Sequence, residues 1–170
     1  TIIPRGATGG VTWTIPEHDR PYTSMSEYKD ELARAMGGRI AEEVIYGRDH
    51  VTSGASSDLR HATAIARDMV IEQGMGKRLS DQSFHEDEGG LMMDRITREK
   101  PYSDKTAEEI DQEIRDLIEE ATRRARDIIK TNRALLEKLK DALLEYETLD
   151  ADEVAAILDG MVLPETAKLY

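Results

Sequence analysis

The sequence predicts a mainly α-helical fold with a small β element at its N-terminus. Apolar residues recur at helical spacing over residues 28–70 and again over residues 110–158, and two short β-branched runs stand near the start. Hydrophobic residues make up 39% of the 170 residues but aromatic residues only 5%, so Leu, Ile, Val, Ala and Met must build the core. Unbranched side chains lose little rotamer freedom in a helix, which favours the helical interpretation.

The β element is expected in residues 1–16. The runs TII (1–3) and GVTWTIP (10–16) are rich in β-branched residues, and PRGATG between them is rich in turn formers. This pattern predicts a small β-hairpin or two edge strands. The segment EHDRPYT (17–23) then reads as a polar loop.

The first helix is predicted to begin at Ser24, because Glu27 three residues later completes a capping-box pattern, and to stop at Gly47. Gly37 and Gly38 lie inside it, at a cost of up to ~1 kcal/mol each relative to alanine. A cost of that size suggests a backbone that another helix or a site approaches closely. The role of the two glycines stays open between those alternatives.

The second helix is predicted from Ser57 or Asp58 to Gly74. Residues 75–102 show no clean period, contain the acidic run HEDEGG, and are interpreted as an irregular, mobile connection. A long helix should begin at Ser103 and break at Thr131–Asn132, before a shorter leucine-rich helix. The pair Asp150 and Glu153 predicts one more helix start. Residues 1–158 are thus expected to form one domain, and residues 159–170 a C-terminal tail.

Composition narrows the function classes. The net charge of −12 argues against nucleic-acid binding, which needs clustered Lys and Arg. The chain has no cysteine, which excludes disulfides and thiolate metal sites and suggests a reducing compartment. No apolar run is long enough to span a bilayer. The chain opens without a start methionine, so we expect it to be a piece of a longer protein whose membrane anchor could precede Thr1.

Two common motifs are missing. A zincin helix needs two histidines four residues apart with a glutamate between them. The four histidines are His18, His50, His61 and His85, and none has a partner at that spacing. The stretch GMGKR (74–78) is not a phosphate-binding loop, because it lacks the first glycine and the final Ser or Thr.

Asp58 and Glu42 carry the remaining candidate chemistry. Asp58 and His61 stand three residues apart on one helix and could share a metal, but an acidic residue in a first helical turn more commonly complements the helix dipole. Glu42, beside Glu43, falls between Ile40 and Val44, close to the apolar face of its helix. This placement suggests a buried partner, such as an arginine or a metal-bound histidine.

The motifs, taken in order, become specific. TIIPRG, GVTWTIPEHDR, GGRIAEEVIYG, VTSGASSDLRHAT, ARDMVIEQGM and ALLEYETLDADEV together resemble the peptidase domain of the FtsH family, the membrane-anchored ATP-dependent zinc metalloproteases. The resemblance covers nearly all of residues 1–158. It implies that Asp58 is the third zinc ligand, that Glu42 orients a ligating histidine, and that Val11 and Thr12 belong to an edge strand that receives substrate. It reserves no role for His61.

The resemblance also implies what this chain lacks. In the family the HExxH helix, with two zinc-binding histidines and the glutamate that takes the proton of the zinc-activated water, lies shortly before the TIIPRG strand. This chain therefore contains no catalytic residue, and on its own we expect it to hold no stoichiometric zinc and to cleave no peptide. ATP and Mg would bind an ATPase domain that is also absent.

For the intact protein the resemblance implies a homo-oligomer, a hexamer on the membrane, that degrades unfolded or membrane polypeptides in protein quality control. It would be anchored by absent N-terminal segments. This domain would lie in a reducing compartment, on the cytoplasmic side of the inner membrane or an organelle equivalent. The alternative is a catalytically inactive relative that acts as a scaffold or assembly subunit.

Overall fold

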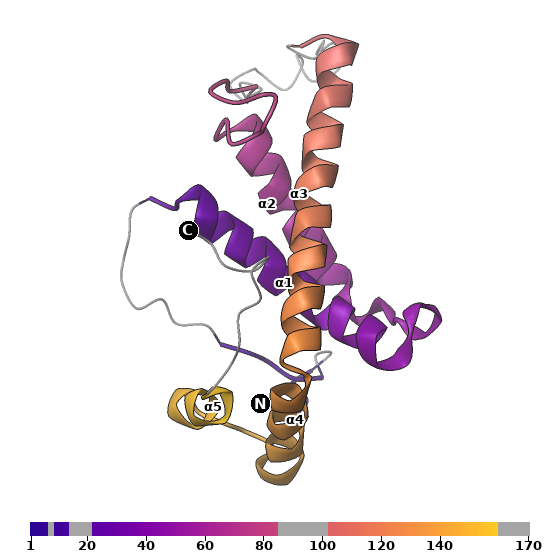
Figure 1. Ribbon diagram of the computed structural model, residues 1–170, viewed down its shortest axis with the longest axis vertical. Coiled ribbons are helices and arrows are strands. Elements are labelled where there is room, and N and C mark those ends of the chain that lie inside the picture. The colour runs from indigo at the N-terminus through magenta and orange to yellow at the C-terminus, as the bar shows by residue number, and fades with distance from the viewer. Residues whose placement is uncertain (7–8, 14–21, 85–101, 160–170) are drawn as a thin grey trace. The chain divides into compact units, whose positions relative to one another are not determined.

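The structure is a computed structural model that describes residues 1–6, 9–13, 22–84 and 102–159. Within these residues the chain forms five α-helices and two short 3-10 turns, and none is assigned to a strand. The predicted mainly α-helical fold is confirmed. The chain divides into two compact units, one formed by residues 23–125 and the other by residues 1–22 together with 126–170 (Figure 1).

Helix α1 (Met25–Tyr46) opens the unit formed by residues 23–125. Its N-terminus has the predicted capping box, because the Glu27 N–H donates to Ser24 Oγ at 3.3 Å and Glu27 Oε2 accepts from the Ser24 N–H at 2.7 Å. It stops at Gly47, whose φ of 86° lies in the region that favours glycine. The side chains that it buries recur at helical spacing: Leu32, Ala33, Met36 and Ile40.

Gly37 and Gly38 do not serve the close approach that their cost suggested. A Cβ atom built on either residue would meet no atom of the described structure within 4 Å, apart from the helix's own backbone. No other part of the described chain fills the space that a Cβ atom at either position would occupy. The expectation of a close backbone contact is therefore wrong for the described residues.

Helix α2 (Ser56–Ile71) packs against α1. The side chains that it buries are Ala62, Ile65, Ala66, Met69, Val70 and Ile71. Two 3-10 turns, η1 (Arg48–His50) and η2 (Ser53–Ala55), connect the two helices. The helix begins within two residues of the predicted start and ends before Gly74, which follows in a left-handed conformation with φ of 60°.

The segment after α2 was predicted to be irregular, and its described part, residues 75–84, contains no helix. It is nevertheless tied down: Met75 and Ser80 form an isolated antiparallel bridge, and the Phe84 N–H donates to the Ile71 carbonyl at 2.7 Å. Residues 85–101, which carry the acidic run, lie outside the described part of the chain.

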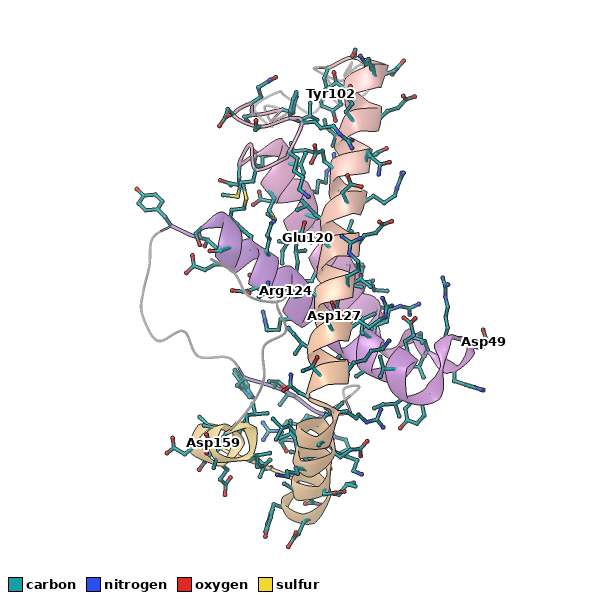
Figure 2. All side chains as sticks on the ribbon, viewed as in Figure 1. Asp49, Tyr102, Glu120, Arg124, Asp127 and Asp159 are labelled. Carbon is teal, nitrogen blue, oxygen red and sulfur yellow. The ribbon has the colours of Figure 1, made fainter. Side chains whose placement is uncertain are left out.

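Helix α3 (Asp104–Thr131) contributes its residues up to Ala125 to the same unit. Its apolar stripe buries Ile110, Leu117, Ala121 and Ala125. Charged side chains join it to α1, since Lys29 Nζ lies 2.8 Å from Glu120 Oε1 and Arg124 pairs with Asp30. Figure 2 marks Glu120 and Arg124 one turn apart on α3.

The second unit contains α4 (Arg133–Tyr146) and α5 (Ala151–Leu158), which contact each other. The predicted break after Thr131 and the predicted capping box of Asp150 with Glu153 are both present. Residues 160–170 of the predicted tail lie outside the described part. The single domain predicted over residues 1–158, with a tail from 159, stays a prediction.

Candidate functional site

Asp58 lies in the first turn of α2, at the third position after the N-cap residue Ala55. Its side chain is exposed. No hydrogen bond or ion pair joins it to another described residue, and the N-terminus of α2 has no side-chain cap. Asp58 therefore does not act as a hydrogen-bonding cap here. What remains of that interpretation is the weaker attraction between a carboxylate and the helix dipole.

Glu42 lies on α1 and is half-buried. Its two carboxylate oxygens reach the turn that precedes α2: Oε2 accepts from the Thr52 N–H at 2.7 Å, and Oε1 accepts from the Thr52 hydroxyl at 3.0 Å. Among the described residues, the partners of this carboxylate are therefore a backbone amide and a hydroxyl, and not the arginine that was suggested as one alternative. Its predicted role toward a zinc-bound histidine stays a prediction.

His61 faces α1 rather than standing beside Asp58 as a ligand. Its Nε2 lies 3.1 Å from Glu31 Oε1, and Arg34 Nη2 lies 3.2 Å from the same oxygen. The ring nitrogen that faces Glu31 is occupied by an ordinary contact between helices. His61 is therefore not placed as a second metal ligand beside Asp58.

The residues of this region do not by themselves form a zinc site. Catalytic zinc is normally held by three protein ligands. Across residues 1–6, 9–13, 22–84 and 102–159, no three His, Cys, Asp or Glu side chains gather in a way that could hold a metal. Asp58 offers a single carboxylate, which is too few for the metal that the sequence resemblance implies.

The predicted edge strand lies in the other unit. Thr1 and Val11 exchange two hydrogen bonds, from the Thr1 amino group to the Val11 carbonyl at 3.0 Å and from the Val11 N–H to the Thr1 carbonyl at 3.0 Å. Gly10 fits this pairing closely, since a Cβ there would lie 2.8 Å from the Thr1 carbonyl oxygen. The expected hairpin pairing is present at this pair, and residues 14–16 lie outside the described part.

On the side of the strand that faces away from Thr1, Thr12 has no hydrogen-bond partner among the described residues. In an antiparallel pair, the residues that flank a hydrogen-bonded one direct their N–H and C=O groups away from the partner strand. The backbone of Val11 is therefore committed to Thr1, whereas Thr12 directs its groups outward. Thr12 is exposed, and no hydrogen bond joins it to another described residue.

Two residues that sequence reasoning missed hold this framework. Thr52 connects Glu42 to the start of α2, and its signal was a threonine directly before the turn-forming run SGASS. Glu113 on α3 is 1% exposed, and its signal was an acidic residue three positions after Ile110 and four before Leu117, on the apolar face. Both signals were visible, but neither resembles a catalytic motif.

None of the described helices is both long and apolar enough to cross a membrane.

Comparison with known proteins gives concordant matches. The sequence model of peptidase family M41 matches residues 1–157. The chain is 43% identical over 162 residues to the ATP-dependent zinc metalloprotease FtsH of a Synechococcus strain, which covers 94% of this chain and 25% of that protein. The Bacillus subtilis protein of the same name is 42% identical over 167 residues, covering 97% and 26%.

A third relative, the FtsH protein of Photobacterium profundum, is 44% identical over 155 residues, covering 91% of this chain and 22% of that protein. The chain thus spans about a quarter of the length of these relatives.

Proposed function

Because the chain belongs to peptidase family M41, we propose that it forms part of the peptidase domain of an ATP-dependent zinc metalloprotease, in which Asp58 is one of the zinc ligands. The observation that carries this proposal is the state of the Asp58 carboxylate. It is exposed, at a defined position in the first turn of α2, and it has no hydrogen-bond or ion-pair partner among the described residues.

A free carboxylate at a rigid position is what a metal site needs from each ligand. A ligand that is already hydrogen-bonded or paired must give up that partner before it binds a metal. Asp58 has no such partner to lose, and the buried residues of α2, among them Ala62 and Ile65, hold the helix that carries it. At least one further ligand has to come from outside the described residues, since these contain no group of three His, Cys, Asp or Glu side chains that could hold a metal.

Glu42 has room for the role that the resemblance gives it. A carboxylate carries about four lone-pair sites, and Thr52 uses two of those on Glu42. A ring N–H of a zinc-bound histidine could take another, which would fix that histidine's tautomer and orientation. We therefore assign Glu42 two positioning roles, one toward Thr52 and one toward a zinc-bound histidine.

The edge at Thr12 is the proposed point of substrate contact. An extended polypeptide can add to an exposed strand edge through main-chain hydrogen bonds, which do not depend on its sequence. The outward direction of the Thr12 backbone groups supports this assignment, whereas Val11 would act by holding Thr12 against Thr1. Such sequence tolerance suits an enzyme whose substrates are unfolded polypeptides.

Of the remaining properties of the intact protein, the relatives' names support dependence on ATP and zinc, and the sequence resemblance suggests the others. An ATPase module that binds ATP and Mg would deliver substrate. The working form would be a homo-oligomer, a hexamer, anchored to a membrane by segments outside this chain, with this domain in a reducing compartment. We include these properties in the proposal for the complete protein.

The test of the function is Asp58→Ala in the complete protein that carries this chain. We expect loss of stoichiometric zinc and of proteolysis of an unfolded substrate, with ATP hydrolysis retained. Asp152→Ala is the matched control, because Asp152 is also an exposed acid in the first turn of a helix, α5.

If Asp58 only complemented a helix dipole, the two variants would behave alike and both would keep zinc. A wild-type protein with neither zinc nor proteolysis would instead favour an inactive scaffold.

A further inference from the structure

We propose that Thr52 is a positioning residue that fixes Asp58, and that Glu42 acts on Asp58 through it. This inference rests on the proposed function, since it concerns how the proposed ligand is held. It comes from a chain of hydrogen bonds that joins α1 to the 3-10 turn directly before α2 and that involves no residue singled out from the sequence except Glu42.

The first step is the direction of the hydrogen bonds at Thr52. An ionised carboxylate only accepts, so the Thr52 hydroxyl must donate to Glu42 Oε1 at 3.0 Å. The oxygen of that hydroxyl is then free to accept, and it accepts from the Gly54 N–H at 3.2 Å. The Thr52 N–H meanwhile donates to Glu42 Oε2 at 2.7 Å. One carboxylate thus fixes both the backbone and the side chain of Thr52.

The second step is the continuity of the helical backbone from Thr52 to Asp58. The 3-10 turn η2 (Ser53–Ala55) runs directly into α2, because Ser56 itself has αR backbone angles and its N–H donates to the Ser53 carbonyl. Ala55 precedes α2 without offering a cap, whereas Thr52 caps η2 with its hydroxyl. Thr52 therefore caps the continuous helical segment, η2 followed by the first turn of α2, that carries Asp58.

The third step is the tightness of the turn. A Cβ atom on Gly54 would lie 3.2 Å from Thr52 Oγ1 and 4.0 Å from Glu42 Oε1. The glycine lets the hydroxyl and the carboxylate reach the turn together. Because Asp58 makes no hydrogen bond of its own, its position is set by the backbone that carries it, and that backbone is anchored at Thr52.

The experiment compares Thr52→Val with Thr52→Ser in the complete, zinc-loaded protein. Valine keeps the shape of threonine but loses the hydroxyl, while serine keeps the hydroxyl. We expect Thr52→Val to weaken zinc affinity, measured by chelator competition, by about tenfold or more. We expect Thr52→Ser to stay within about twofold of wild type, and the Gly54 amide to exchange faster only in the valine variant.

A second variant, Glu42→Gln, provides a test that does not rely on Thr52→Val alone. Glu42→Gln loses one of the two bonds to Thr52, because the amide nitrogen cannot accept. If the two residues act in one chain, the double variant with Thr52→Val should lose little more zinc affinity than the more affected single variant. Additive losses would show two independent roles and would overturn the inference.

The outcomes separate this inference from the proposed function. If Thr52→Val keeps wild-type zinc affinity while Asp58→Ala loses zinc, Asp58 is a ligand that Thr52 does not position. If Asp58→Ala also keeps its zinc, the proposed ligand assignment fails and the inference fails with it. Equal losses in the valine and serine variants would mean that the hydroxyl is not what matters, which also overturns the inference.

Discussion

Oε1 of Glu113 accepts a hydrogen bond from the backbone N–H of Arg78 at 2.6 Å, across 35 positions of sequence. The other carboxylate oxygen accepts from the Lys77 N–H at 2.9 Å. Glu113 is 1% exposed and is the one buried charged residue of the described part of the chain. It fastens the turn after α2 to α3 from inside the unit.

Glu113→Gln should therefore destabilise the fold. An amide oxygen can accept one of the two N–H groups, but the amide nitrogen then faces the other and leaves a buried donor without a partner. The expected loss is about 1–3 kcal/mol in the free energy of unfolding, measured by urea titration. Glu108→Gln, on the exposed side of the same helix, is the control. Equal stability of the two variants would contradict this account.

Glu120 should make the free energy of unfolding depend on pH in the acid range. Burial by itself raises its pKa, but the hydrogen bond and the charge of Lys29, followed by those of Lys77, together hold the pKa below its ordinary value of 4.5. A carboxyl with a lowered folded pKa contributes stability above its unfolded pKa and loses it as the pH falls through the folded value. The contribution is thus full at neutral pH and lost below about pH 4.5.

Glu120→Gln should accordingly cost more stability at pH 7 than at pH 3. Because Glu120 is a third exposed, the difference should be at most about 1 kcal/mol. Urea unfolding at a series of pH values measures it, with Glu119→Gln on the exposed face as the control. A variant whose deficit is the same at both pH values would rule out the linkage.

Gly38→Ala should stabilise this chain. Gly38 is exposed inside α1, and an added Cβ would meet nothing within 4 Å in the described structure. The expected gain is up to about 1 kcal/mol, from better helix propensity. Gly47→Ala is the opposite control, because φ of 86° strains any residue with a Cβ. Loss of stability in Gly38→Ala, read from the melting temperature, would show that something does approach this face.

Asp58→Ala should barely change the stability of the chain. Its carboxylate makes no hydrogen bond to a described residue, so only the dipole attraction of about 0.3–1 kcal/mol is lost. Asp150→Ala should cost more, about 1–2 kcal/mol, because Asp150 Oδ1 accepts from the Glu153 N–H at 2.9 Å in a capping box. Thermal unfolding of both variants makes the comparison. A large loss in Asp58→Ala would make a later loss of proteolysis uninformative.

The 170-residue chain by itself should bind less than stoichiometric zinc and cleave no peptide. It contains one proposed ligand and no histidine pair at zincin spacing. Metal analysis after dialysis against a weak chelator tests the first point, and hydrolysis of an unfolded reporter protein tests the second. Tightly bound zinc at a ratio of one, lost in Asp58→Ala, would mean that residues outside the described part complete the site.

Much of the fold was predictable because its local signals were strong. Ser24 with Glu27 and Asp150 with Glu153 marked two helix starts, and both capping boxes are present. The break at Thr131 and Asn132 was equally local. The glycine pair in α1 misled, because helix propensity gives the cost of a glycine but does not identify what, if anything, it accommodates.

The candidate site was less predictable from its residues than from the resemblance. Asp58 could be read as an acid that complements the helix dipole or as a metal ligand, and only the structure shows that its carboxylate makes no hydrogen bond at the start of α2. The link through Thr52 could not be foreseen, because it depends on how α1 and the turn before α2 meet in space. Glu113 was overlooked for the same reason, since its partners are backbone amides that no side-chain pattern announces.

The pairing at the N-terminus has a consequence for how the chain is made. The Ile2 N–H donates to the Glu147 carbonyl at 2.9 Å, and the Thr1 hydroxyl reaches the same oxygen across 146 positions. Residues 23–125 emerge from a ribosome as one continuous stretch and can collapse first. The opening TII cannot form this pairing until Glu147 has been translated. The hydrogen bonds of Thr1 and Ile2 to the Glu147 carbonyl should therefore form only after the end of the fourth helix has left the exit tunnel.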